Sequence, residues 1–168
     1  MYRPPTPRQV NLVEIQPTNK RGAMDPYISK LDTPERCEQY AQNVQTRSPK
    51  DAQAARRKAV ELRAQKYGAK TDPEREAIQA VYAYERVQSE KKGKAFHASR
   101  TWQMINNRGI IPSIEHIVKQ SSESVGYTAL VEMGMKDMAF EAVVLRYPNL
   151  FGAQAVERSK ERMIENNL

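Results

Sequence analysis

Three short motifs, each a polar residue followed by proline, divide most of this chain into helices. Thr33-Pro34, Ser48-Pro49 and Asp72-Pro73 each place proline in the first turn of a segment with helical spacing of apolar residues. Proline is tolerated there because the first N–H groups of a helix have no partner within the helix. Gly68 and Gly93 follow the second and third of these segments where a helix would end. The pattern therefore predicts consecutive helices from Thr33 onward.

The expected fold is all-α, a compact bundle of about seven or eight short helices. The V-V-L run at 143–145 could form a strand, but no second segment of that quality exists to pair with it. Ser99 is expected to cap the fourth helix. A single helix is expected over Lys136–Arg146. The predicted helices begin near Pro34, Pro49, Asp72, Ser99, Pro112 or Ser113, Val125, Lys136 and Ala153.

Residues 1–23 differ in composition from the rest of the chain. Four prolines and little periodicity predict a disordered or extended tail. A single helical domain is expected over 24–168, and Met24 is a candidate for the natural start. The charged residues of the last helix are expected to form a solvated face. They are Glu157, Arg158, Lys160, Glu161 and Arg162.

The chain lacks the sequence features of membrane and secreted proteins. Its apolar runs are too short to span a bilayer, and its N-terminus lacks a hydrophobic signal core. The single cysteine, Cys37, permits no internal disulfide, which fits a reducing compartment. We therefore expect a cytoplasmic protein without membrane contact. Cys37 shares the apolar stripe of its helix, so a buried and unreactive thiol is expected.

The positive charge of the chain is concentrated in its middle. The formal net charge is +7. Residues 34–68 carry eight Lys or Arg against four Asp or Glu, and 94–120 carry four against one. Residues 121–168 carry five against seven. A basic region favours contact with nucleic acid or another acidic surface, and the alternative is a solvated surface that only confers solubility.

An acid-free stretch runs from Lys91 to Ile114. Its cations are Lys91, Lys92, Lys94, Arg100 and Arg108. Helical projection of 99–108 at about 100° per residue puts Trp102 and Ile105 on one side. The other side carries Arg100, Gln103, Asn106 and Asn107. Arg pairs well with guanine, and Asn or Gln with adenine, while the lysines would contact phosphates.

A second basic surface is predicted on the helix that begins at Pro49. Arg56, Arg63 and Lys66 lie near one side of it. The sequence leaves open whether this side adjoins the acid-free stretch. The candidate nucleic-acid-binding residues are Lys91, Lys92, Lys94, Arg100, Gln103, Asn107, Arg108, Arg56, Arg63 and Lys66.

No catalytic residue, metal ligand or cofactor is predicted. His97, His116 and the lone cysteine lack metal-ligand spacing, and the glycine-rich nucleotide-binding motifs are absent. Asp72 and Glu90 resemble part of a nuclease motif. They fall on one predicted helix, roughly 27 Å apart, so they cannot share a metal ion.

Four segments of the chain resemble a family of bacterial helical proteins to which no activity is assigned. They are Y-A-Y-E-R-V-Q-S-E-K-K-G-K at 82–94, A-S-R-T-W-Q-M-I at 98–105, G-Y-T-A-L-V-E-M-G-M at 126–135 and F-E-A-V-V-L-R-Y-P at 140–148. The resemblance covers about residues 24–165. It implies a bacterial or phage source and a stand-alone small domain, and it assigns a role to no residue.

The sequence therefore predicts a non-enzymatic protein that binds DNA or RNA through residues 91–108, helped by the second basic surface. The fourth helix differs from a standard reading helix in one respect. The turn before it is longer than the three or four residues of a helix-turn-helix motif. An ordinary amphipathic surface helix has the same pattern. The alternative function is a helical adaptor that binds another protein.

Overall fold

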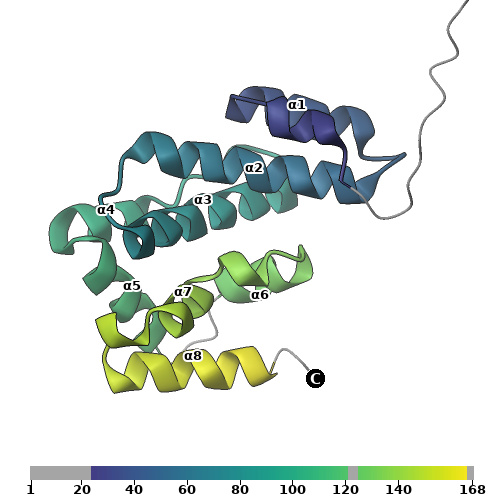
Figure 1. Cartoon of the computed structure of the whole chain (residues 1–168). Coiled ribbons are helices and arrows are strands. Elements are labelled where there is room, and N and C mark those ends of the chain that lie inside the picture. The colour runs from purple at the N-terminus through teal and green to yellow at the C-terminus, as the bar shows by residue number, and fades with distance from the viewer. Residues whose placement is uncertain (1–23, 121–124, 166–168) are drawn as a thin grey trace, which may run out of the picture.

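The computed structural model describes residues 24–120 and 125–165 (Figure 1), and helices are the only regular elements within these ranges. The α-helices are α1 (Pro34–Val44), α2 (Pro49–Tyr67), α3 (Asp72–Lys92), α4 (Ser99–Arg108), α5 (Ile110–Lys119), α6 (Val125–Glu132), α7 (Phe140–Arg146) and α8 (Ala153–Glu165). Short 3-10 helices are η1 (Pro26–Lys30), η2 (Lys136–Met138) and η3 (Pro148–Leu150). The all-α prediction is confirmed, and the 143–145 run is helical. The predicted tail 1–23 lies outside the described residues.

The long helix α3 lies at the centre of the bundle. It packs against α2 on one side and against α5, α6 and α7 on the other. In Figure 1, α1 covers α2 at the top of the molecule, and α8 lies beneath α5 and α7 at the bottom. Because α3 has neighbours on several sides, its buried residues are not confined to one stripe. They are Ala77, Ile78, Ala80, Val81, Ala83, Val87 and Gln88.

Small residues let α1 lie close to α2. Ala52, Ala55 and Ala59 of α2 are fully buried in a cluster with Cys37 and Ala41 of α1. Burial raises the pKa of the Cys37 thiol. A protonated, inaccessible thiol is a poor nucleophile. The predicted buried cysteine is therefore confirmed.

Threonine caps fix where two of the helices begin. The Thr33 hydroxyl accepts from the Arg36 N–H, and that of Thr71 accepts from the Glu74 N–H. Glu74 reaches back to the Thr71 N–H, which completes a capping box at the start of α3. The prediction for Ser99 is wrong. Ala98 is the N-cap of α4 and Ser99 is its first helical residue, so the Ser99 hydroxyl does not cap this helix.

The fifth helix begins at Ile110, earlier than predicted. Gly109, with φ of 88°, ends α4 and also precedes the first residue of α5, so the chain turns within a single residue. Pro112 is then the third residue of α5, where its missing N–H costs no helical hydrogen bond. The prediction that Pro112 or Ser113 marked the start placed the proline too early in the helix.

The single helix predicted over Lys136–Arg146 is divided in two. η2 ends before Ala139, whose φ of −77° and ψ of 158° are extended, and α7 begins at Phe140. Because of this break, η2 contacts α2 through Asp137 and Arg57, while α7 packs on α8. The sequence around Ala139 has no proline or glycine, so no local signal marked it.

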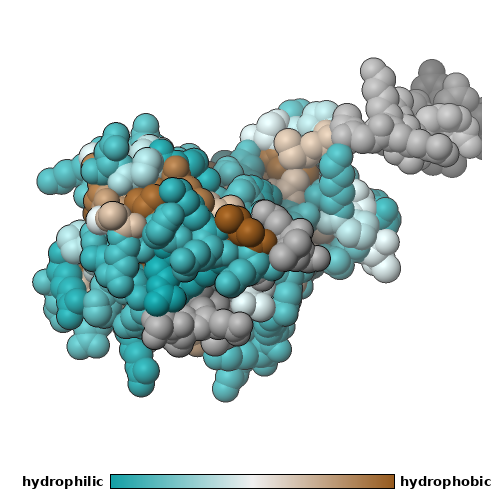
Figure 2. Space-filling view, turned by 90° about the horizontal axis from the view of Figure 1, so that it is seen from below, coloured by the Kyte–Doolittle hydropathy of each residue, from teal (hydrophilic) through white to brown (hydrophobic). Residues whose placement is uncertain are grey.

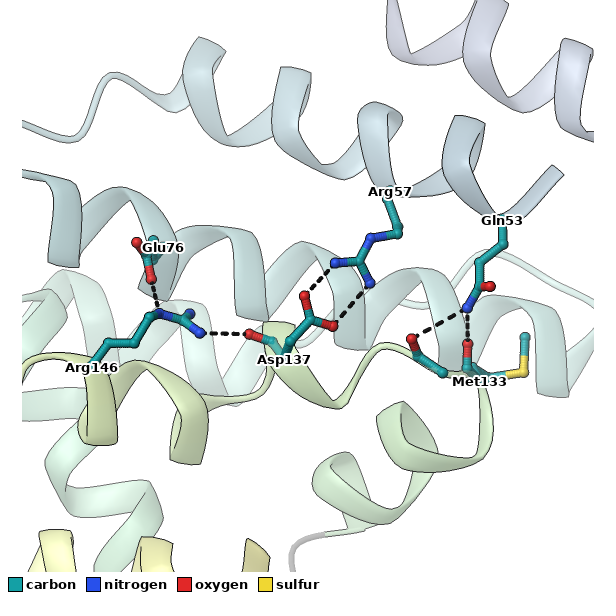
Figure 3. A network of polar contacts seen from close by, with 7 residues as sticks. Gln53, Arg57, Glu76, Met133, Asp137 and Arg146 are labelled. Carbon is teal, nitrogen blue, oxygen red and sulfur yellow. Dashed lines mark hydrogen bonds and ion pairs between the residues drawn. The ribbon is translucent and has the colours of Figure 1, made fainter. Parts of the chain in front are cut away.

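Polar side chains join η2 and α7 to the helices above them (Figure 3). Arg57 of α2 forms a two-pronged ion pair with Asp137 of η2. Arg146 donates to Glu76 of α3 at 2.6 Å and to the Asp137 carbonyl at 3.0 Å. The Tyr147 hydroxyl donates to the other Glu76 oxygen at 2.8 Å. Together these contacts fix the register between the two halves of the bundle.

The Arg57–Asp137 pair predicts a small acid-dependent loss of stability. Arg57 holds the pKa of the Asp137 carboxyl below its usual value, so the pair stabilises the fold above the unfolded pKa, about 3.9. That contribution is lost as pH falls through the lower folded pKa. Since Asp137 is 57% exposed, we expect Asp137→Asn to cost about 0.5–1 kcal/mol at pH 7. Urea unfolding should show that difference vanish well below pH 4. A difference that persists unchanged at pH 2.5 would contradict this account.

A close approach at Gly134 joins the α6–η2 turn to α2. Gln53 of α2 donates to the Met133 carbonyl at 2.8 Å and to the Gly134 carbonyl at 3.3 Å (Figure 3). Gly134 has φ of +67°, and a Cβ there would lie 2.6 Å from Gln53 Nε2. The backbone conformation therefore favours glycine at this position, and a Cβ would also force the end of the Gln53 side chain to move.

We expect Gly134→Ala to destabilise the protein by about 2 kcal/mol, because backbone strain is added to the loss of Gln53 hydrogen bonds. Gly68→Ala is the matched control. Gly68 has φ of +80° with nothing near its absent Cβ, so only the strain, about 1 kcal/mol, should appear. Chemical denaturation would measure both. Equal losses would show that the Gln53 contact contributes nothing.

The expected solvated face of the last helix is wrong at Arg162. This residue is buried, and its guanidinium donates to Glu141 at 2.7 Å and to the Gln120 carbonyl at 2.6 Å. Glu141, on α7, is only 2% exposed. Charge alone placed Arg162 in solvent, whereas the packing of α8 on α7 puts it inside with a partner.

Candidate nucleic-acid interface

The helix α4 presents the two sides expected from its sequence. Ile105 is buried and Trp102 is half-buried against the body of the protein. Arg100, Gln103 and Asn107 are exposed. The predicted orientation of the helix is therefore confirmed.

Trp102 is the centre of an aromatic cluster with Tyr67, Tyr82 and His97. Its ring stacks with Tyr67 at 5.7 Å between centroids and 29° between planes, and with His97 at 6.2 Å and 11°. Tyr82 contacts it at 5.2 Å with a tilted ring. Tyr67 ends α2 and Tyr82 belongs to α3, so the cluster joins α4 to both helices. Two of its rings reach solvent, because Tyr67 is 41% exposed and the His97 side chain is 67% exposed.

One carboxylate holds the start of α4 in place. Glu85 Oε1 accepts from the Ala98 N–H at 2.8 Å and from Trp102 Nε1–H at 2.7 Å. His97 Nδ1 lies 2.9 Å from the same oxygen. Glu85 is only 12% exposed, so these contacts form in a partly desolvated site, where hydrogen bonds to a charged acceptor are strong. They fix the indole and the imidazole in orientation.

The same geometry brings part of the second basic surface to α4. Arg63 lies one turn before Tyr67 on the same side of α2, and Lys66 precedes Tyr67 directly. Burial raises the pKa of Tyr82, while the charge of nearby Arg63 acts against that rise. Arg63 thus shares a side of α2 with Tyr67, whose ring stacks on Trp102 of α4. The end of α2 therefore adjoins α4 through Tyr67 and Trp102.

Three of the predicted site residues have other surroundings. Lys91 forms an ion pair with Glu132 of α6, and Lys92 lies 3.9 Å above the centre of the Phe96 ring. Arg56 lines a cleft of roughly 350 Å³ together with Glu132. It precedes Tyr67 by about three turns, roughly 16 Å along α2. These cations do not join the aromatic cluster.

The remaining predicted cations have no acidic partner among the described residues. Within the part of the chain that the structure describes, they form no ion pair. They are Arg63, Lys66, Lys94, Arg100 and Arg108. We call these five cations, with Tyr67, His97, Gln103 and Asn107, the α4 surface.

Sequence reasoning missed Tyr67, His97 and Glu85 as parts of this site. Tyr67 shares the side of α2 that carries Arg63, and this spacing was the only available signal. Nothing in the sequence indicates that a tyrosine of α2 and a histidine of the loop before α4 contact one tryptophan. Residues far apart in sequence meet here only because α4 folds back over α3.

The described residues contain no arrangement typical of a metal centre. No three His, Cys, Asp or Glu side chains among them converge as metal ligands. Asp72 and Glu90 lie on the unbroken helix α3, as the sequence argument required. No described helix has an apolar stretch long enough to cross a bilayer. Comparison with family models, curated proteins and solved structures gives no match, so the resemblance to a bacterial helical family stays a prediction.

Proposed function

We propose that this protein binds nucleic acid through the α4 surface. The observation that carries the proposal is the aromatic cluster, in which Tyr67, one turn after Arg63 on α2, stacks on Trp102 of α4. No residue of α4 is acidic, and Glu85 beneath it is mostly shielded from solvent. The surface therefore combines unpaired positive charge with side chains that can contact bases.

The two kinds of side chain have different tasks in this proposal. The cations other than Arg100 contact phosphates, which contributes most of the affinity through release of counterions. Gln103 and Asn107, together with Arg100, face outward from α4 and contact base edges. Affinity should then fall steeply as salt rises.

The alternative of a protein-binding adaptor has less support from the surface. Among the residues that the structure describes, the large exposed apolar side chains are scattered over separate elements. They are Met24, Tyr27, Tyr67, Leu150 and Ile164. Seen from the side of α8 in Figure 2, the surface is mainly hydrophilic, and hydrophobic residues form only limited areas. A groove for an apolar partner helix would need a larger continuous area.

A double variant tests the proposal directly. We expect Lys94→Ala/Arg100→Ala to lower the affinity for DNA and RNA about tenfold or more at low salt. The dependence of log Kd on log salt should become shallower by about one unit, because the phosphate contact of Lys94 is lost. Fluorescence anisotropy with labelled oligonucleotides at several salt concentrations measures both.

Lys30→Ala/Arg47→Ala is the matched control, since it removes two exposed cations from the region of η1 and α1. It changes the net charge equally and should lower affinity much less. Equal affinity of the wild type and the α4 double variant would disprove the proposal. Equal losses of affinity in both double variants would contradict the proposal, because binding would then depend on net charge and not on the α4 surface. A protein partner recovered in stoichiometric amount after nuclease treatment would favour the adaptor.

A further inference from the structure

The exposed rings of the α4 surface suit one form of nucleic acid better than another. A base pair within a duplex has both faces covered by its neighbours, so only its edges and the phosphates are accessible. An unpaired base has a free face that can stack on an aromatic ring. Exposed rings beside cations are therefore typical of a protein that binds unpaired bases.

We infer that the α4 surface takes a single-stranded nucleic acid, with unpaired bases stacked on His97 and Tyr67. This inference rests on the proposed function and specifies that the nucleic acid bound is single-stranded. Each of these two rings contacts Trp102 and still has a large part of its surface in solvent. A base can thus extend the existing stack without displacing a side chain.

The rings are held in place before any ligand arrives. Glu85 fixes the indole through Nε1–H and holds the imidazole through Nδ1. The Tyr67 ring stacks on the indole of Trp102, with 5.7 Å between the ring centroids. Preorganised rings lose little conformational freedom on binding, which favours stacking over an equally hydrophobic but mobile side chain.

The cations are placed to follow a strand across these rings. Lys66 adjoins Tyr67 in sequence, Arg63 lies one turn before it, and Arg100 follows His97 by three residues. Each ring thus has an unpaired cation close in the chain. A positively charged path with aromatic steps is the usual design of sites for single strands.

The single tryptophan of the chain provides a direct measurement. Trp102 contacts both rings, so its fluorescence should be quenched when bases stack beside it. The probes are a mixed-sequence 15-nucleotide strand as RNA, the same strand as DNA, and the matching duplex of each. At low salt, both single strands should bind at least about tenfold more tightly than their duplexes and quench Trp102.

Two substitutions separate stacking from charge. Tyr67→Leu and His97→Ala should each lower the affinity for single strands about tenfold, the usual loss for one stacked base, and leave the duplexes within about twofold. Tyr67→Phe should restore wild-type affinity, because it keeps the ring and the contact with Trp102. Tyr27→Ala is the matched control, since Tyr27 is a 46% exposed tyrosine that contacts Tyr40 on η1 and α1. Thermal unfolding checks that every variant remains folded.

The outcomes distinguish this inference from the proposed function. A preference for single strands in both the RNA and DNA arms, lost in Tyr67→Leu and kept in Tyr67→Phe, supports it. Duplexes that bind as tightly as single strands in either arm overturn it and leave the proposed function intact. Loss of affinity in Tyr67→Phe equal to that in Tyr67→Leu also overturns it, because the ring is then not the cause. No binding of any probe at low salt overturns both.

Discussion

Arg162→Ala is expected to cost about 3–5 kcal/mol in the free energy of unfolding, the typical loss when one member of a buried ion pair is removed. The substitution leaves the Glu141 carboxylate, which is only 2% exposed, without its guanidinium. It also removes the donor to the Gln120 carbonyl. Urea denaturation followed by circular dichroism measures the loss. Because small domains have total stabilities of about 5–15 kcal/mol, the variant should unfold far more readily than the wild type.

Two comparison variants test the physical reason. Lys160→Ala removes the exposed partner of Glu157, on the same helix, and should cost less than about 1 kcal/mol. Glu141→Leu/Arg162→Met removes both buried charges at similar volume and should cost less than Arg162→Ala alone, since no charge is left without its partner. An Arg162→Ala loss as small as that of Lys160→Ala would contradict a buried pair at this position.

Glu85→Ala is expected to loosen α4 and lower stability by about 2–4 kcal/mol. The Ala98 N–H and the Trp102 Nε1–H lose their acceptor, and each unsatisfied donor in a partly buried site costs about 1–3 kcal/mol. The fluorescence of Trp102 should shift to longer wavelength as the indole becomes solvated. Urea unfolding and emission spectra of the folded variant measure the two effects.

The same variant separates positioning from charge in the proposed function. Removal of a negative charge near cations should by itself strengthen binding of nucleic acid. If Glu85 instead positions the rings, Glu85→Ala should weaken binding of nucleic acid. Glu85→Gln keeps an acceptor oxygen without the charge, so it should retain most of the stability and bind at least as tightly as the wild type. Tighter binding by Glu85→Ala would show that the orientation of Trp102 and His97 does not matter.

Much of the fold follows from local features of the sequence. The threonine caps and first-turn prolines determined where α1 and α3 begin, and Gly68 and Gly93 adopt the left-handed conformation that ends α2 and α3. These signals act within one helical turn, so they can be read without knowledge of the neighbours. Where a boundary depends on packing, as at Ala139, the local sequence contained no signal.

The candidate site was predicted only in part. The outward side of α4 followed from periodicity, because one side of the helix is apolar and the other polar. The sequence did not predict which cations are ion-paired, which are buried and which are exposed. Lys91 is paired with Glu132 from α6, and Arg162 is buried against Glu141, while Arg63 lies one turn from the tyrosine that stacks on Trp102. Pairing between side chains on different helices depends on how those helices cross.

The sequence by itself determined that this chain is helical, where most of its helices lie and which side of α4 is exposed. It did so because capping, proline placement and apolar periodicity are local properties of the backbone and of single helices. The tertiary structure decided which basic residues form a surface, because it folds α4 back over α3 and stacks Trp102 on Tyr67 and His97. The net charge follows from the sequence, but whether the cations lie on one surface depends on how the helices pack. The acid-free stretch is therefore divided. Lys91 and Lys92 contact Glu132 and Phe96, whereas α4 contacts the end of α2 through Trp102 and Tyr67.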